Sequence, residues 1–163
     1  MESQQRSVAP AAFTPPPIVW REATADDAPF LLELTDTTMR EHISEAGGSV
    51  ERLRAWLEER NAGMSWSIVM IDGTPVGAAA CLRWPTIIHL HSIHVLPEYQ
   101  DRGIGSAMLR RLAAWADTLK LPIGLEVLKT NDSARRLYER HGFALGKEDG
   151  ANYHMIRWPA PRV

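Results

Sequence analysis

A glycine-containing turn between an apolar stretch and an amphipathic helix constrains this chain most. Residues 100–105 read Gln-Asp-Arg-Gly-Ile-Gly and follow an apolar stretch that ends at Leu96-Pro97. Apolar side chains then recur at helical spacing from Ile104 to Leu119. The first N–H groups of a helix have no intrahelical partner and carry the positive end of its dipole. Because Gly103 and Gly105 let a ligand approach the backbone, we expect a phosphorylated group to bind here.

Two common phosphate-binding motifs do not fit this turn. A P-loop has Lys-Ser/Thr after its last glycine, whereas Ser106-Ala107 follow Gly105. A dinucleotide fingerprint needs a third small residue where Met108 stands. The pattern that fits is Gln/Arg-x-x-Gly-x-Gly/Ala, and with it the chain resembles the GNAT family of acetyl-CoA-dependent N-acetyltransferases. A second pattern typical of that family, Asn-x-x-Ala-x-x-x-Tyr-x-x-x-Gly-Phe, spans residues 131–143 and strengthens the resemblance.

The resemblance covers residues 86–146 and extends loosely back to residue 18. It implies a mixed α/β fold, the GNAT acyl-CoA N-acyltransferase fold, in which a mostly antiparallel central sheet carries helices on both faces. At 163 residues a single domain is expected. We place it at residues 18–159, after a flexible Pro/Ala-rich tail at residues 1–17.

Local patterns predict the elements in chain order. Thr24 and Asp27 form a capping box that opens a helix reaching Arg40, and Pro29 disturbs its first turns. Asp72-Gly73 indicates a tight hairpin, and Asn131 caps a short helix that ends at Gly142. The other expected elements are strands at 18–21, 66–71, 74–82, 87–95, 122–128, 143–145 and 153–158, and helices at 50–60 and 104–119.

Composition narrows the range of partners. The formal net charge of -2 gives no global field that would recruit nucleic acid or an anionic membrane. Cys81 is the single cysteine, which excludes an internal disulfide or a thiolate-rich metal site and suits a reducing cytoplasm. The apolar stretch Val76 to Leu82 is too short to span a bilayer, and residues 1–17 have no signal-peptide core. We therefore expect a cytoplasmic protein.

The resemblance implies a binding site for acetyl-CoA. Backbone amides of Ile93 and Val95 would contact the thioester carbonyl and the pantetheine arm. Asn131 would contact the same arm or position its helix, and its simplest reading is a helix cap. The residues that would hold the pyrophosphate are Gln100, Arg102, Gly103, Ile104, Gly105 and Ser106. No metal is implied.

Acetyl transfer to an amine needs a base, an oxyanion donor and an acid for the departing thiolate, because most amines are protonated at neutral pH. The resemblance assigns the acid to Tyr138. The simpler alternative is that Tyr138 is a tyrosine of the hydrophobic core. Glu126 resembles the base of ribosomal-protein alanine acetyltransferases and lies between apolar residues, where desolvation would raise its pKa. His89, His91 and His94 offer a rival base, of which His91 is the best placed. Strict alternation puts it on one face of its strand with His89, Ile93 and Val95.

The sequence constrains the identity of the acceptor amine least. The resemblance implies that residues 39–48 wall its site, where Glu41 and Glu45 could attract a cation or simply be solvated. Cys81 reads as a packed thiol, so we expect direct transfer in a ternary complex. The leading expectation is acetylation of a small-molecule amine. The alternatives are a peptide N-terminus as acceptor and a non-catalytic acyl-CoA-binding module, and homodimerisation is a habit of the family.

Overall fold

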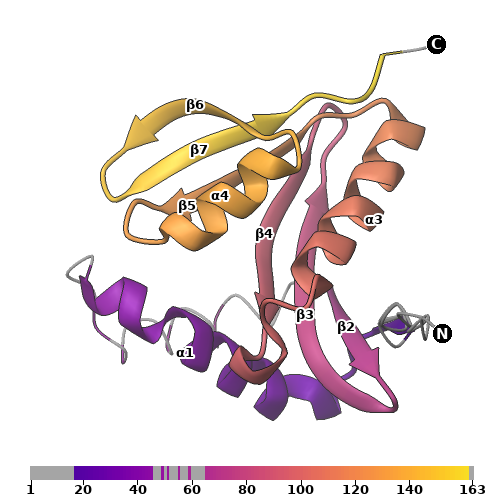
Figure 1. Ribbon diagram of the computed structural model, residues 1–163, viewed down its shortest axis with the longest axis vertical. Coiled ribbons are helices and arrows are strands. Elements are labelled where there is room, and N and C mark those ends of the chain that lie inside the picture. The colour runs from indigo at the N-terminus through magenta and orange to yellow at the C-terminus, as the bar shows by residue number, and fades with distance from the viewer. Residues whose placement is uncertain are drawn as a thin grey trace, which may run out of the picture.

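The computed structural model of the protein describes residues 17–45, 49, 51, 55, 59 and 65–161. A seven-stranded sheet with the order β1-β2-β3-β4-β5-β7-β6 forms its centre (Figure 1). Neighbouring strands are antiparallel except for β4 and β5, which run parallel. The strands are β1 (Ile18–Glu22), β2 (Trp66–Ile71), β3 (Thr74–Arg83), β4 (Ile88–Val95), β5 (Ile123–Leu128), β6 (Ala144–Asp149) and β7 (Asn152–Arg157).

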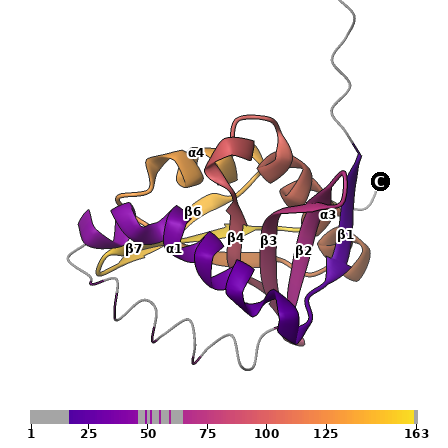
Figure 2. The ribbon, with the colours of Figure 1, turned by 90° about the horizontal axis from the view of Figure 1, so that it is seen from below.

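Helices cover both faces of this sheet (Figure 2). On one face α1 (Ala28–Glu45) buries apolar side chains against β2 and β3. On the other face α3 (Ile104–Leu119) packs against β4 and β5, together with α4 (Asp132–Arg140). The 3-10 turns η1 (Ala25–Asp27) and η2 (Pro97–Tyr99) precede α1 and α3. The expected mixed α/β, mostly antiparallel fold is therefore confirmed. The helix expected at 50–60 and the tail at 1–16 lie outside the continuously described residues.

The strong turn signals of the sequence form where they were expected. Asp72 and Gly73 both have positive φ, 49° and 78°, which is the geometry of a two-residue hairpin turn between β2 and β3. The last two strands differ most from expectation, because β6 continues to Asp149 before its hairpin with β7. No helix among the described residues is long and apolar enough to cross a membrane.

The histidine strand departs from the expected alternation. Ala80 pairs with Ser92, but Cys81 pairs with Leu90, so His91 is an extra residue that forms a bulge in β4. A one-residue insertion moves the following side chains to the opposite face. Ile93 therefore packs with Leu90 in the core under α3. The expectation that His89 and His91 share a face with Ile93 and Val95 is wrong for this reason.

The capping box at the start of α1 is anchored by an ion pair. The Thr24 N–H donates to Asp27 Oδ2 at 2.8 Å, and two Arg21 nitrogens donate to the same carboxylate at 2.7 Å each. These bonds lower the pKa of Asp27 from its ordinary 3.8 to about 2. The contact connects β1 to the turn that leads into α1, and thus fixes how α1 enters its place on the sheet.

We expect Asp27→Asn to lower the free energy of unfolding at neutral pH by about 1–2 kcal/mol, the range for a part-exposed hydrogen bond to a charged group. Since the folded pKa is lowered, the contribution is complete above pH 3.8 and disappears as the pH falls through about 2. Urea unfolding between pH 2 and pH 7 measures this difference. Exposed Asp26→Asn is the matched control, and an equal loss in the two variants at neutral pH would contradict the role of the ion pair.

Candidate active site

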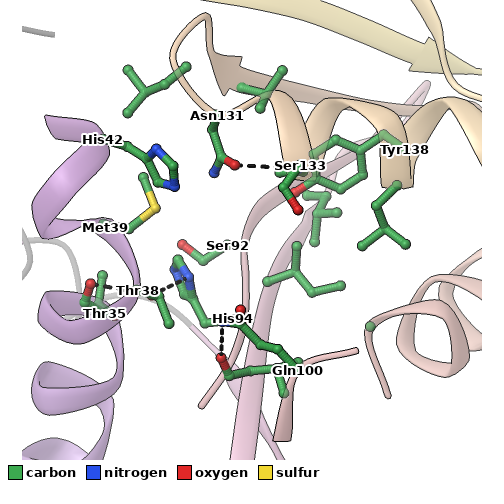
Figure 3. A pocket seen from close by; sticks show the side chains of 18 of the residues that line it. Thr35, Thr38, Met39, His42, Ser92, His94, Gln100, Asn131, Ser133 and Tyr138 are labelled. Carbon is green, nitrogen blue, oxygen red and sulfur yellow. Dashed lines mark hydrogen bonds between the residues drawn. The ribbon is translucent and has the colours of Figure 1, made fainter. Parts of the chain in front are cut away.

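A cleft opens where two parallel strands of the sheet separate. β4 and β5 pair only at residues 88–90 and 123–125, and beyond these positions β5 pairs with β7 alone. The cleft has a volume of about 760 Å³ and receives side chains from α1, β4, β5, α4 and the turn before α3 (Figure 3). Two motifs that lie far apart in the sequence, the turn at 100–105 and the segment at 131–138, therefore face one cavity.

The free edge of β4 presents main-chain groups to this cleft. The Leu96 N–H donates to Val76 O of β3 at 2.8 Å, whereas Val95 O accepts a 2.9 Å bond from Gln100 Nε2 on the opposite side. The N–H and C=O of one strand residue point to the same edge. The N–H groups of Val95, and of Ile93 two residues earlier, are consequently directed away from β3. Both residues line the cleft.

The turn before α3 leaves backbone donors exposed. Gly103 has a φ of 79° and caps α3 without a side-chain hydrogen bond, and the first backbone bond of the helix joins the Ala107 N–H to Gly103 O. The N–H groups of the first turn are therefore available to an anion. Gly103, Ile104, Gly105 and Ser106 all line the cleft.

Gly105 also has a packing role. A Cβ at this position would lie 3.2 Å from Leu137 Cδ2, so the glycine lets α3 approach α4 closely. Two other predicted pyrophosphate ligands make contacts within the protein, and of these Gln100 also lines the cleft. Gln100 uses its side-chain amide on Val95 O, and Arg102 extends over the Tyr99 ring, 5.4 Å from its centroid, outside the cleft lining.

Asn131 and Tyr138 bring α4 to the cleft. Asn131 Oδ1 accepts the Ala134 N–H at 3.1 Å, which confirms its expected role as a helix cap, and the residue also lines the cleft. Tyr138 is only 8% exposed and packs against Phe143, while its hydroxyl end reaches the cleft (Figure 3). Burial raises the pKa of Tyr138 above its ordinary value of 10.0. The phenol therefore keeps its proton at neutral pH and can donate it.

Glu126 lines the cleft from β5 and is half-exposed. Its side chain is 49% exposed, and its Oε1 lies 3.6 Å from His154 Nδ1 on β7, the strand that pairs with β5. The carboxylate is therefore less enclosed than a position between two apolar residues suggests, and it is in reach of the cavity.

The histidines of β4 also line the cleft, each in a different setting. His91 occupies the bulge, and its ring centroid lies 4.4 Å from that of His89. His94 Nδ1 lies 2.9 Å from Thr38 Oγ1 on α1, and burial lowers the pKa of His94 to about 4. Over the described part of the chain, no group of three or more His, Cys, Asp or Glu side chains is arranged to hold a metal ion.

One wall of the cleft, where the family resemblance implies the acceptor amine, is formed by α1. Thr35, Thr38, Met39 and His42 line it, which includes two residues of the expected 39–48 wall. Thr130 Oγ1 donates to His42 O at 3.1 Å and joins the end of α1 to the loop after β5. Trp84 is 48% exposed and belongs to neither the cleft lining nor the core.

Cys81 is a packed thiol, as the sequence indicated. It contacts the core between α3 and the sheet, and burial raises its pKa to about 12. A thiol with so high a pKa is a poor nucleophile at neutral pH, because the thiolate is the reactive form.

Three cleft contacts were not anticipated from the sequence. They are the bonds of Thr38 to His94, of Thr130 to His42, and of His141 Nε2 to Ser106 Oγ at 3.0 Å. Each joins residues at least 35 positions apart. A spacing of three residues puts Thr35 and Thr38 on one face of α1. No local sequence pattern predicts that Thr38 contacts His94, however, because the two residues lie far apart in the chain.

Comparisons with known proteins agree with this geometry. Residues 28–143 match the Acetyltransferase (GNAT) family. An uncharacterized N-acetyltransferase of Methanocaldococcus jannaschii is 29% identical over 100 residues, which cover 54% of this chain, and the chain spans only 42% of that relative's length.

Solved structures share the fold at low identity. The PaiA N-acetyltransferase of Thermoplasma acidophilum, solved with coenzyme A, superposes with a TM-score of 0.69 at 18% identity, covering 87% of this chain and 99% of its own. The alanine N-acetyltransferase of ribosomal protein S18 from Escherichia coli has a TM-score of 0.64 at 18% identity, with 90% and 96% covered. With the match over residues 28–143, these findings establish that the chain belongs to the GNAT acetyltransferase family.

Proposed function

We propose that this protein transfers the acetyl group of acetyl-CoA to a primary amine, by direct attack in a ternary complex, and that the acceptor is a small molecule. The observation that carries the proposal is the convergence of three features on one cleft. They are the free N–H groups of β4, the uncapped N-terminus of α3 and the Tyr138 hydroxyl.

The cofactor fits the donors that line the cleft. The pantetheine arm would lie along the free edge of β4, with the N–H groups of Ile93 and Val95 as donors to it and to the thioester carbonyl. The pyrophosphate would accept from the first turn of α3, where Ser106 adds a hydroxyl held by His141. Negative charge that develops on the carbonyl oxygen is stabilised by such preorganised donors.

The chemical step requires a neutral amine and an acid. The amine nitrogen attacks the thioester carbonyl carbon, a C–N bond forms, and the C–S bond breaks as the thiolate leaves. Tyr138 donates its proton to the departing sulfur, because its hydroxyl reaches the cleft and a phenol is protonated at neutral pH. Glu126 and His91 remain candidate bases, and both line the cleft.

A panel of acceptors tests the function itself. Release of CoA from acetyl-CoA is measured with small amines, polyamines, aminoglycosides and short peptides. Turnover with a small amine supports the proposal, whereas turnover with peptides alone would favour N-terminal acetylation. Binding of acetyl-CoA without turnover of any acceptor would favour an acyl-CoA-binding module.

Tyr138→Phe should lower kcat about 100-fold while the KM for acetyl-CoA stays within about twofold, because only the acid is removed. Tyr153→Phe, on β7 and outside the cleft lining, is the matched control and should keep wild-type rates. Steady-state kinetics with both substrates varied measure the effect. Parallel loss of kcat and acetyl-CoA binding in Tyr138→Phe would instead mark the residue as a packing tyrosine.

Ser106→Ala should weaken binding of CoA about tenfold, since a hydrogen bond from a hydroxyl to an anion contributes about 1.5 kcal/mol and the backbone donors remain. Isothermal titration calorimetry with CoA measures the change. Thr118→Ala, at the exposed far end of the same helix, is the control. Unchanged affinity of the Ser106 variant would mean that the pyrophosphate lies elsewhere.

A further inference from the structure

His94 is a titratable side chain of the cleft to which the mechanism above gives no role. It lies on β4 between Ile93 and Val95, the residues whose N–H groups reach the cleft. Its ring contacts α1 on the acceptor side, whereas Tyr138 enters from α4 on the other side (Figure 3). An amine that attacks a thioester between these two sides would lie next to the imidazole.

The contact with Thr38 determines which nitrogen of the ring carries the proton. Thr38 Oγ1 lies 2.9 Å from Leu34 O and 2.9 Å from His94 Nδ1. A threonine hydroxyl has one proton, and a carbonyl oxygen can only accept. The Thr38 proton therefore points to Leu34 O, in the back-bonded arrangement common in helices. Nδ1 then donates to Oγ1, and Nε2 keeps its lone pair.

Nε2 is available to a substrate. Within residues 17–45 and 65–161 it makes no hydrogen bond. Because the ring is withdrawn from water, its pKa is about 4 and the imidazole is neutral throughout the neutral pH range. The other titratable groups that line this side are His42 of α1 and His89 and His91 of β4. All are histidines, so no fixed charge from these residues competes for the amine.

We propose that His94 accepts the proton released by the attacking amine and that Thr38 orients its ring for this step. The inference rests on the proposed function. As the C–N bond forms, the amine proton moves to Nε2. As the C–S bond breaks, the thiolate takes the Tyr138 proton. The imidazolium and the phenolate are then neutralised by proton exchange with solvent.

The surroundings of the other candidates favour this assignment. The Glu126 side chain is 49% exposed, and its carboxylate lies beside His154 of β7. It therefore faces solvent and a neighbouring strand as well as the cleft. His91 lies in the bulge against His89. His94 has a neutral ring whose Nε2 is open to the cleft, next to the N–H groups of Ile93 and Val95.

The first test is kinetic. His94→Gln, which retains a polar side chain of similar length but no proton acceptor of imidazole type, should lower kcat about 100-fold with little change in the KM for acetyl-CoA. Thr38→Val should lower kcat about tenfold, and Thr38→Ser, which keeps the hydroxyl, should restore the rate. Thr118→Val is the control, because Thr118 makes the same type of back-bond, to Ala114 O, on distant α3.

The second test does not depend on turnover. Long-range ¹H–¹⁵N spectra of the histidines report the tautomer of His94 directly. We expect Nδ1–H in the wild type and in Thr38→Ser, and loss of this preference in Thr38→Val. Thermal unfolding of each variant verifies that it is folded.

The outcomes separate this inference from the proposed function. A wild type that acetylates no amine contradicts the function and this role with it. An active wild type with unchanged kcat in His94→Gln contradicts the role of His94 alone. An Nε2–H tautomer in the wild type would overturn the orientation by Thr38.

Discussion

The parallel pairing of β4 and β5 ends after three residue pairs, and the site depends on that ending. If the ladder continued, the N–H groups of Ile93 and Val95 would bond to β5 and no cleft would exist. The antiparallel pairing of β5 with β7 holds β5 in place after it leaves β4. The bond from Gln100 to Val95 O engages the last carbonyl on the free edge of β4, beside the N–H groups that point to the cavity.

The bulge at His91 makes the two sides of the cleft different. By adding one residue it turns Ile93 toward α3 and the core, while His94 faces α1 and bonds to Thr38. The wall under α3 thus carries main-chain donors and an uncapped helix, and the wall under α1 carries histidine and hydroxyl groups. In the proposed function, the bulge places the cofactor and the amine on opposite walls.

Local signals explain what could be predicted from the sequence. Asp72-Gly73, Asn131 and Gly103 act through their own backbone or within three residues, so each forms the expected turn or cap. The two family motifs identify the fold for the same reason, because each contains a complete strand-to-helix or helix-to-strand connection.

What could not be predicted depends on distant partners. Strict alternation missed the bulge, because the register of β4 is set by β3 and not by its own residues. The exposure of Glu126 follows from its place opposite His154 on β7. Thr38 and His94 are 56 residues apart, and only the packing of α1 on the sheet brings them together.

Titration of ¹⁵N-labelled protein with CoA, followed by amide chemical shifts, locates the cofactor on the protein. If the cofactor lies along the free edge of β4 and at the start of α3, saturable shifts are expected at Ile93, Val95 and residues 103–106, with little change in β1 and β2. Shifts confined to other parts of the sheet, or no shifts at saturating CoA, would rule out this position for the cofactor.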